Sequence, residues 1–357
     1  MSFPRVTIDG AALRDNLATV RRLAPNSRVV AAIKANAYGH GLIPVARALV
    51  DADAFGVARI EEAITLRAAG ITKSVLLLEG VFSAEQLALA GQHGFEIVVH
   101  TFEQLAMLER YSGEHRFSVW LKLDTGMSRL GFRLADFAAA RAALTRCSCV
   151  GQLRLMTHLA SAEQPDDAAT KQQLQRFRAL ADAEQLERSI ANSAGLIAWP
   201  DARVEWVRPG LMLYGISPFA HTDAAKLGLR PAMTLTTRLI AVREADVGDG
   251  VGYNAIWRAQ RRSRIAVAAI GYGDGYPRGM RNGAPVLVNG REAPLIGRVS
   301  MDMTTIDVTE FPQVKVGDEV TVWGDGLPVE RVAACAGTIG YELVCRVTAR
   351  VAVEWRG

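Results

Sequence analysis

The feature that most constrains the fold is an alternation of strand-like and helix-like segments over the first two-thirds of the chain. Short apolar runs alternate with amphipathic runs of helical period. The expected strands end at or near Lys34, Ala58, Leu78, His100, Leu123, His158, Asn192 and Val207. Eight βα units favour a closed parallel (β/α)8 barrel over a doubly wound sheet, and such barrels carry their active sites at the carboxyl ends of the strands.

The pattern changes after Arg230 and Pro231 to short alternating strands with glycine turns. Asn289 and Gly290 lie between two apolar runs and predict a type I′ hairpin. One helix is expected near residues 330–336, and a closing strand over residues 342–353. The sequence therefore predicts an α/β chain of two domains: a (β/α)8 barrel over residues 1–230 and a mostly β domain over residues 231–357.

Composition argues against several classes of function. Half of the 357 residues are hydrophobic, but no apolar run reaches the roughly 20 residues of a membrane helix. Residues 1–5 do not resemble a signal peptide, so a cytoplasmic location is expected. The four cysteines form no C-x-x-C pair and no zinc pattern, so no metal is expected. The net charge is only +4 and the arginines are scattered, which argues against nucleic acid as a partner.

Lys34 directly follows the apolar run of residues 29–33 and opens a polar, glycine-flanked turn. At the end of a buried strand, its long cationic side chain would point into the crevice of the sheet. Burial lowers the pKa of a lysine, and such lysines form Schiff bases with carbonyl compounds such as pyridoxal phosphate. For a lone lysine, a side chain that reaches back to solvent is the more common arrangement.

Other polar residues close the expected strands. Lys122 and Asp124 end the fifth strand, and His158 ends the sixth. Asn192 and Ser193 end the seventh, just before a short helix over residues 194–199. A serine at a helix N-terminus can bind a phosphate in this part of a barrel, although it can equally serve as a simple N-cap.

Residues 32–41, which include Lys34 and Tyr38, resemble without a gap the cofactor attachment segment of the alanine racemases. The resemblance implies that Lys34 carries pyridoxal 5′-phosphate and that Tyr38 contacts its phosphate. Residues 121–132 resemble the segment whose arginine, here Arg129, contacts the cofactor's phenolic oxygen and the substrate carboxylate. Lys122 matches a lysine that is often carbamylated in this family.

The resemblance continues through the rest of the barrel and into the second domain. Arg208, in residues 206–210, matches the arginine that faces the pyridine nitrogen. Tyr253 matches the second catalytic base, and Met301 and Asp302 match a pair that contacts the substrate. The other implied cofactor contacts are His158, Asn192, Ser193, Gly210, Leu211 and Tyr341. Two positions depart from the family pattern: Asn254 replaces the usual glycine, and Glu163 the usual aspartate.

The resemblance implies an isomerase that interconverts L-alanine and D-alanine by a two-base mechanism, with Lys34 and Tyr253 on opposite faces of the substrate. Arg208 and His158 would help to stabilise the phenolate of Tyr253. It also implies a head-to-tail homodimer in which Lys34 of one subunit works with Tyr253 of the other. The corresponding role is D-alanine biosynthesis for peptidoglycan precursors, with D-alanine breakdown as the open alternative.

Three other functions remain as alternatives. A broad-spectrum racemase of small amino acids would share these residues but usually carries an export signal, and the sequence does not rank alanine against serine. A barrel-type amino-acid decarboxylase shares the two-domain plan, but its Glu-Pro-Gly-Arg phosphate turn and its cysteine-aspartate pair are missing. A non-catalytic pyridoxal-phosphate-binding protein would be a bare barrel without Tyr253.

Overall fold

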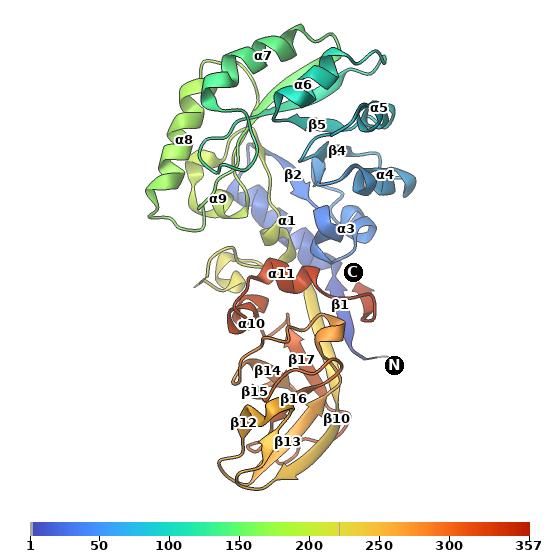
Figure 1. The fold of residues 1–357 in the computed structure, drawn as a ribbon, viewed down its shortest axis with the longest axis vertical. Coiled ribbons are helices and arrows are strands. Elements are labelled where there is room, and N and C mark those ends of the chain that lie inside the picture. The colour runs from blue at the N-terminus through green and yellow to red at the C-terminus, as the bar shows by residue number, and fades with distance from the viewer. Residues whose placement is uncertain (1–2, 221) are drawn as a thin grey trace. The chain divides into compact units, whose positions relative to one another are not determined.

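The computed structural model describes residues 3–220 and 222–357 (Figure 1). Residues 1 and 2, with which the expected first domain begins, lie outside the described residues. The chain forms two compact units. The barrel unit comprises Asn16–Ala37 and Gly41–Leu213, and the sheet unit comprises Met1–Asp15, Tyr38–His40 and Tyr214–Gly357.

Within the described residues, the barrel unit holds eight strands that close into a parallel barrel in sequence order, β2 to β9. The strands are β2 (Arg28–Ala32), β3 (Ala54–Val57), β4 (Ser74–Leu77), β5 (Glu96–Val99), β6 (Phe117–Lys122), β7 (Val150–Met156), β8 (Arg188–Ser189) and β9 (Trp206–Val207). The predicted (β/α)8 barrel is therefore confirmed.

Helices connect these strands, and several begin at the residues that favour helix starts. The helices are α1 (Gly10–Leu23), α2 (Lys34–Tyr38), α3 (Leu42–Ala48), α4 (Ile60–Ala68), α5 (Ala84–Gln92), α6 (Phe102–Glu109), α7 (Phe137–Arg146), α8 (Ala168–Ala181) and α9 (Ser193–Ala198). The Ser83 and Thr101 hydroxyls accept hydrogen bonds from the amides of the first turns of α5 and α6. Such caps satisfy amides that have no partner inside the helix.

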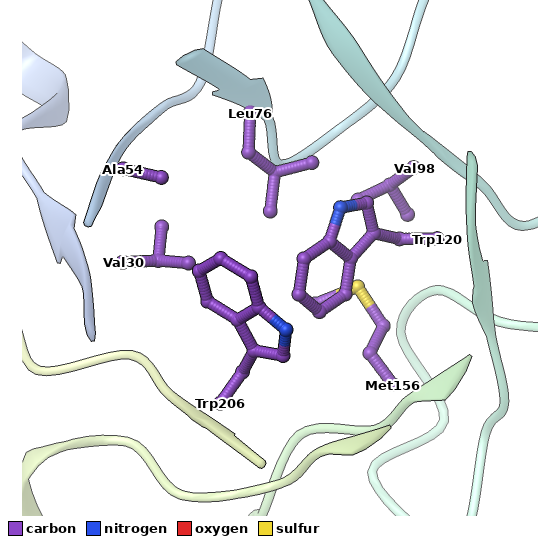
Figure 2. Packing of buried hydrophobic residues seen from close by; sticks show 7 residues of the cluster. All are labelled: Val30, Ala54, Leu76, Val98, Trp120, Met156 and Trp206. Carbon is purple, nitrogen blue, oxygen red and sulfur yellow. The ribbon is translucent and has the colours of Figure 1, made fainter. Parts of the chain in front are cut away.

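An apolar layer fills the middle of the barrel (Figure 2). It consists of Val30, Ala54, Leu76, Val98, Trp120, Met156 and Trp206. The rings of Trp120 and Trp206 meet edge to face, with centroids 5.5 Å apart. Because side chains alternate along a strand, the residues two positions before and after this layer also face the barrel axis. The layer therefore separates two further sets of inward-facing side chains.

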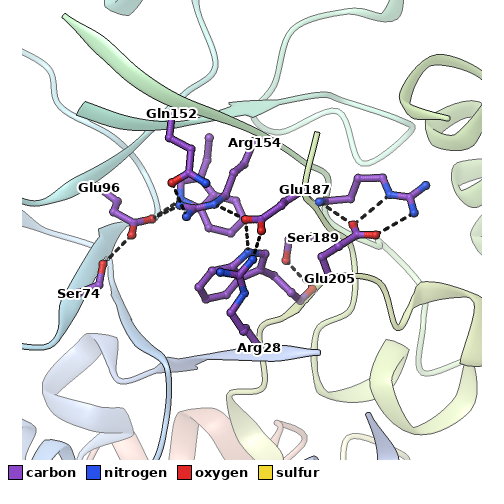
Figure 3. Close-up of polar contacts among 11 residues, drawn as sticks. Arg28, Ser74, Glu96, Gln152, Arg154, Glu187, Ser189 and Glu205 are labelled. Carbon is purple, nitrogen blue, oxygen red and sulfur yellow. Dashed lines mark hydrogen bonds and ion pairs between the residues drawn. The ribbon is translucent and has the colours of Figure 1, made fainter. Parts of the chain in front are cut away.

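The set on the amino-terminal side of this layer is an ion network centred on Arg154 (Figure 3). Only 7% of the Arg154 side chain is exposed, and it donates to Glu96 at 2.9 Å and to Glu187 at 2.8 Å. The indole N–H groups of Trp120 and Trp206 donate to the same two carboxylates. The Arg154 guanidinium carbon also lies 5.0 Å from the centroids of both indole rings. The network thus fixes the two indole rings of the apolar layer from the amino-terminal side of the barrel.

We expect Arg154→Ala to lower the free energy of unfolding by about 3–5 kcal/mol, because two part-buried carboxylates lose their shared cation. Arg178, whose partner Asp201 is also exposed, provides the control. Arg178→Ala should cost no more than about 1 kcal/mol. Urea unfolding measures both values, and equal losses would show that the Arg154 network does not stabilise the barrel.

The sheet unit holds an eight-stranded sheet in the order β13-β16-β15-β14-β17-β10-β1-β18, as far as the described residues show. Its strands are β1 (Arg5–Asp9), β10 (Met233–Ala245), β13 (Ser263–Ala268), β14 (Pro285–Val288), β15 (Arg291–Ile296), β16 (Thr304–Asp307), β17 (Glu319–Trp323) and β18 (Ala352–Arg356). The short pair β11 (Gly250–Val251) and β12 (Trp257–Arg258) and the helices α10 (Val329–Cys335) and α11 (Gly340–Cys345) complete the unit.

Three details of the sheet unit bear on the sequence predictions. Asn289 and Gly290 both have positive φ, 50° and 78°, and join β14 to β15, so the type I′ hairpin is confirmed. The closing strand expected over residues 342–353 is wrong: α11 occupies its first residues, and only β18 is extended. Short apolar runs do not distinguish a buried helical turn from a strand, and here Leu343 and Val344 are buried on a helix.

Candidate active site

The carboxyl end of the barrel collects a set of inward-facing basic side chains, on the other side of the apolar layer from Arg154. Lys122 ends β6 two residues after Trp120, and Arg208 follows β9 two residues after Trp206. His100 and His158 stand in the same relation to Val98 and Met156. Lys34 follows the end of β2. Strand alternation therefore brings residues from five strands to one end of the barrel.

Burial is the largest cause that lowers the pKa of Lys122 to about 8. The charges of Arg208, Arg129 and Lys34 act in the same direction, whereas the carboxylate of Asp124 opposes them. Burial, followed by the charges of Arg208, Lys122, Arg129 and Lys34, holds the pKa of His158 well below its ordinary value. His158 is therefore a neutral imidazole at neutral pH.

Arg208 is buried, and its hydrogen-bond acceptors are uncharged. It donates to the hydroxyl of Ser189 and to the carbonyl oxygens of Thr157, at 2.6 Å, and Ile190, at 3.3 Å. Burial lowers the pKa of Arg208 to about 10, so the guanidinium stays charged at neutral pH. Neutral acceptors fix its position and leave its positive charge for an anionic or electron-rich ligand.

The loop that carries Arg129 is organised by Asp124. One carboxylate oxygen of Asp124 accepts hydrogen bonds at 2.9–3.1 Å from the backbone amides of Gly126, Met127 and Ser128. The amide of Phe132 donates to the carbonyl of Lys122 at 2.8 Å, which closes the loop. Asp124 therefore determines the conformation of the loop and, with it, the position of the Arg129 backbone.

Asn192 and Ser193 divide the two roles that the sequence left open for the start of α9. The side chain of Asn192 is the N-cap and accepts a hydrogen bond from the amide of Gly195 at 2.9 Å. The hydroxyl of Ser193 accepts from the amides of Gly210 at 3.0 Å and Met212 at 3.3 Å. The hydroxyl of Ser193 thus holds the start of α9 against the segment that contains Gly210 and Leu211, and Asn192 precedes Ser193 directly.

The segment after Lys34 has an unusual backbone. Ala35, Asn36 and Ala37 have φ and ψ values between 45° and 54°, which is the left-handed helical region. This conformation costs L-residues roughly 1–2 kcal/mol each. The amide of Ala37 donates to the Ile33 carbonyl at 2.8 Å, and the Asn36 side chain accepts from the amide of Leu42 at 2.9 Å. These bonds hold the turn that fixes the position of Lys34.

Tyr38 belongs to the sheet unit and lies in an aromatic cluster. Its ring stacks on Tyr214, with centroids 4.7 Å apart, and lies 5.7 Å from Tyr341. The ring of His40 also packs against Tyr214, with centroids 4.6 Å apart. Burial, followed by Tyr341 and Cys345, raises the pKa of Tyr38, so its hydroxyl stays protonated and can donate. Sequence reasoning found Tyr38 and Tyr341 but missed Tyr214 and His40.

Tyr253 lies in an exposed turn of the sheet unit, and 64% of it is accessible. The next residue, Asn254, has a φ of 60°, which explains why a glycine is usual there and why asparagine can replace it. Met301 is 52% exposed, and Asp302 accepts a hydrogen bond from Arg350 at 2.6 Å. Tyr253, Met301 and Asp302 are therefore all exposed on the surface of the sheet unit.

The donor set of the barrel end fits an anionic organic cofactor better than a metal. Four cations act on His158, and the nearby carboxylate of Asp124 is occupied by backbone amides. Over residues 3–220 and 222–357, no group of three or more histidine, cysteine, aspartate or glutamate side chains could hold a metal ion. In the same ranges, no helix is both long enough and apolar enough to cross a bilayer.

Fold and site together define a two-unit barrel enzyme with a buried cationic cluster around a strand-end lysine. Two family models match the chain: "Alanine racemase, N-terminal domain" over residues 8–218 and "Alanine racemase, C-terminal domain" over residues 232–355. The chain belongs to the alanine racemase family, as its motifs predicted.

Individual relatives support this assignment over the full length. The chain is 52% identical over 349 residues to an alanine racemase of Aeromonas hydrophila, covering 98% of both chains. It is 54% identical over 352 residues to one of Nitrosococcus oceani, covering 98% of this chain and 99% of the relative. The crystal structure of the biosynthetic alanine racemase from Pseudomonas aeruginosa superposes with a TM-score of 0.98, at 46% identity and full coverage of both chains.

Gly39 provides a test of how tightly the Tyr38 segment is packed. Its φ is +78°, and an added Cβ would lie 2.2 Å from the carbonyl oxygen of Val344. Gly70 has nearly the same φ, +79°, but an added Cβ there would meet nothing within 4 Å. Gly70→Ala should cost the roughly 1–2 kcal/mol of a left-handed L-residue.

We expect Gly39→Ala to lower the free energy of unfolding by clearly more than Gly70→Ala, since backbone must move as well. Chemical unfolding with the tyrosine absorbance as a probe compares the two variants. Equal stabilities would mean that the contact between Gly39 and Val344 is not close in solution.

Proposed function

We propose that the chain is a pyridoxal 5′-phosphate-dependent racemase that interconverts L-alanine and D-alanine. The full-length family match carries this proposal. The buried cationic cluster beside Lys34 supports it, because it suits an anionic cofactor and an amino-acid carboxylate. Neither a decarboxylase nor a non-catalytic binding protein is favoured by any observation.

We assign the cofactor contacts from the matching motif positions. Lys34 would hold the cofactor covalently, and Arg208 and His158 would lie on its ring. The phosphate contacts would come from Tyr38, Asn192, Ser193, Gly210, Leu211 and Tyr341. When bound, the cofactor supplies an electron-accepting ring system that makes the substrate's Cα proton acidic. The uncharged acceptors of Arg208 support its role, because they leave its charge facing the ring site.

The proton transfers need one base on each face of Cα. With the substrate's amine in place of Lys34 on the cofactor, the freed Nζ of Lys34 would take the proton from one face, and the hydroxyl of Tyr253 would give a proton to the other, which would invert the configuration. The reverse reaction exchanges the two roles. Arg129 would bind the substrate carboxylate, since a guanidinium pairs with a carboxylate through two parallel hydrogen bonds. Met301 and Asp302 would complete the substrate contacts.

We further propose a head-to-tail homodimer in which Tyr253, Met301 and Asp302 of one subunit serve Lys34 of the other. The exposure of Tyr253 and Met301 on the sheet unit supports this arrangement, because large apolar side chains in the open indicate an interaction surface. The domain carrying these residues would comprise residues 231–357, and the barrel domain residues 1–230. A cytoplasmic location and a role in D-alanine supply for peptidoglycan stay predictions.

The first test is a racemisation assay of the purified holoprotein across small amino acids. We expect alanine to be the best substrate. Borohydride reduction should fix the cofactor on the peptide that contains Lys34 and on none of the other five lysines. Lys34→Ala should lose both the label and the activity, whereas Lys171→Ala, at an exposed position of helix α8, should keep both. Release of carbon dioxide, or a label on another lysine, would contradict the proposal.

The second test addresses the shared site by complementation. Lys34→Ala and Tyr253→Ala homodimers should each be nearly inactive, because every site lacks one base. In a mixed dimer, one site lacks both residues while the other is intact, so co-refolding should restore up to about half of the wild-type activity per heterodimer. A mixture of Lys34→Ala with Lys34→Met contains no intact lysine and is the control. Verified heterodimers without activity would place both bases in one chain.

A further inference from the structure

Gln173 occupies a position of helix α8 that the helical period assigns to the core. The helix packs on the outside of the barrel (Figure 1), and its buried residues are Thr170, Gln173, Leu174, Phe177 and Ala181. Only 2% of Gln173 is exposed. A buried side-chain amide costs free energy unless its oxygen and both of its N–H groups find partners. Gln173 also lies outside every motif from which the cofactor and substrate contacts were assigned.

The side-chain amide of Gln173 uses its oxygen and both N–H groups. The oxygen accepts from the backbone amide of Ala160 at 2.8 Å. The nitrogen donates to the carbonyl of His158 at 3.0 Å and to the hydroxyl of Thr125 at 3.2 Å. Because a backbone N–H can only donate and a carbonyl can only accept, the bonds to Ala160 and His158 fix which end of the amide is oxygen. Gln173 therefore ties the segment after β7 to the segment after β6.

The buried hydroxyls of Thr125 and Thr157 continue this connection in one direction. The Thr157 hydroxyl donates to the carbonyl of Leu123 at 2.9 Å, so its one hydrogen is committed. In the 2.8 Å contact between the two hydroxyls, Thr125 is therefore the donor. A chain of donors thus runs from Gln173 through Thr125 and Thr157 to Leu123. Successive hydrogen bonds in such a chain strengthen one another.

These side chains connect the two strand ends beyond the regular sheet. The pairing of β6 with β7 ends at Lys122 and Met156. Thr125 and Thr157 follow these two residues and join the backbones through their hydroxyls. Thr157 also connects the chain to Arg208, whose guanidinium donates to the Thr157 carbonyl at 2.6 Å. The hydrogen-bond chain therefore sets the relative position of two strand ends at the cationic end of the barrel.

Thr125 lies at the start of the loop that carries Arg129. The hydrogen bonds that Asp124 accepts are local to this loop, whereas α8 fixes Thr125 from outside it. Gln173 donates to the Thr125 hydroxyl, and Arg176 donates to the Thr125 carbonyl at 3.1 Å. Arg176 is exposed and Gln173 is buried, so the bond from Gln173 is the stronger restraint.

We propose that Gln173 is a positioning residue for the substrate site. It fixes the loop that carries Arg129 against the backbone at His158, and the hydroxyls of Thr125 and Thr157 transmit this restraint. The effect on catalysis rests on the proposed function, in which Arg129 binds the substrate carboxylate. With the chain intact, the loop has one position relative to the ends of β6 and β7. Without it, the loop samples several positions, and the carboxylate is bound less tightly.

Two substitutions of Thr125 separate its hydroxyl from its packing. Thr125→Val keeps the shape of the side chain and removes the hydroxyl, which breaks the chain in the middle. Thr125→Ser keeps the hydroxyl and removes the methyl group. On α8, Gln173→Met removes the first donor at nearly constant size. Gln172→Met, at the exposed neighbouring position, is its matched control.

Amide hydrogen exchange of the holoenzyme measures the loop without depending on activity. The amides of residues 126–128 are hydrogen-bonded to Asp124, so they exchange when the loop opens. Their peptide should exchange about tenfold faster in Thr125→Val and Gln173→Met than in the wild type, since losing a buried hydrogen bond changes an opening equilibrium by about that factor. Thr125→Ser and Gln172→Met should stay within about threefold of the wild type.

The kinetic readout is the KM for alanine. The contact between Arg129 and the carboxylate would be made before and during the reaction alike, so its weakening raises KM and leaves kcat nearly unchanged. KM should rise about tenfold in Thr125→Val and recover to within about threefold in Thr125→Ser, with kcat within about threefold in both. A general loss of stability would instead lower the active fraction, and with it kcat, at an unchanged KM.

A double variant tests whether the residues act as one chain. Gln173 and Thr157 are joined through the hydroxyl of Thr125. Gln173→Met and Thr157→Val should each raise KM, and their combination should raise it by clearly less than the product of the two factors. A full product would show that the two residues act independently, which contradicts the proposed chain.

Two further outcomes would overturn the proposal: equal loop exchange in the wild type and in Gln173→Met, or a KM that rises as much in Thr125→Ser as in Thr125→Val. If the wild type racemises alanine and neither quantity changes, only the role of Gln173 is wrong. If the wild type does not racemise alanine, the proposed function is wrong, and the exchange rates still decide whether Gln173 holds the loop.

A measurement on the unaltered protein covers the case in which the variants do not fold. Ala160 is exposed, but its backbone amide donates to Gln173 and should exchange slowly with solvent. The side-chain N–H groups of Gln173 should also exchange slowly, unlike those of the exposed Gln172. Nuclear magnetic resonance of the holoenzyme measures both. Fast exchange at Ala160 and at the Gln173 side chain would exclude the hydrogen bonds on which the proposal depends.

Discussion

The interleaving of charge and apolar surface inside the barrel is the constraint on which the rest of this structure depends. Trp120, Trp206 and their neighbours fill the middle of the barrel and keep two sets of buried charges apart. On the amino-terminal side, Arg154 is neutralised by Glu96 and Glu187. On the carboxyl side, Asp124 is the one carboxylate among the described residues that acts on Lys122, and one of its oxygens already accepts three backbone amides. The buried charges at the amino-terminal end of the barrel are thus balanced, whereas the carboxyl end carries an excess of positive charge that suits an anionic ligand.

The same asymmetry is visible in the way the cations at the carboxyl end are held in place. Arg208 is held by a hydroxyl and backbone carbonyls, Arg129 by a loop whose shape Asp124 determines, and Lys34 by a left-handed turn. In each case the backbone or an uncharged group holds the basic residue in place, so no carboxylate neutralises the positive charge of its side chain. The free energy that this arrangement costs is offset by the well-packed layer below it and by any anion that binds above it.

Much of the fold and of the site followed from the sequence, and the omissions have physical causes. The barrel was predictable because each βα unit repeats a local hydrophobic period, and Lys34 and Arg129 lie in contiguous motifs. The helix α11 was mistaken for a strand because its six residues are too few to show a helical period. The left-handed turn at Ala35–Ala37 depends on tertiary hydrogen bonds, and alanine gives no local sign of it. The neighbouring positions of His100 and Lys122 at the ends of β5 and β6 depend on the register between strands, which no single segment encodes.

Strand β1, the first of the described strands, gains its second neighbour in the sheet only from β18, the last of them. Residues 5–9 of β1 pair on one side with β10 and on the other, in parallel, with residues 352–356 of β18. During synthesis, every strand of the barrel leaves the ribosome before β18 exists, so the barrel can fold while β1 still lacks one neighbour. The sheet unit can therefore be completed only after β18 has been made. We expect this closure to be slow, because it joins segments that lie far apart in the sequence.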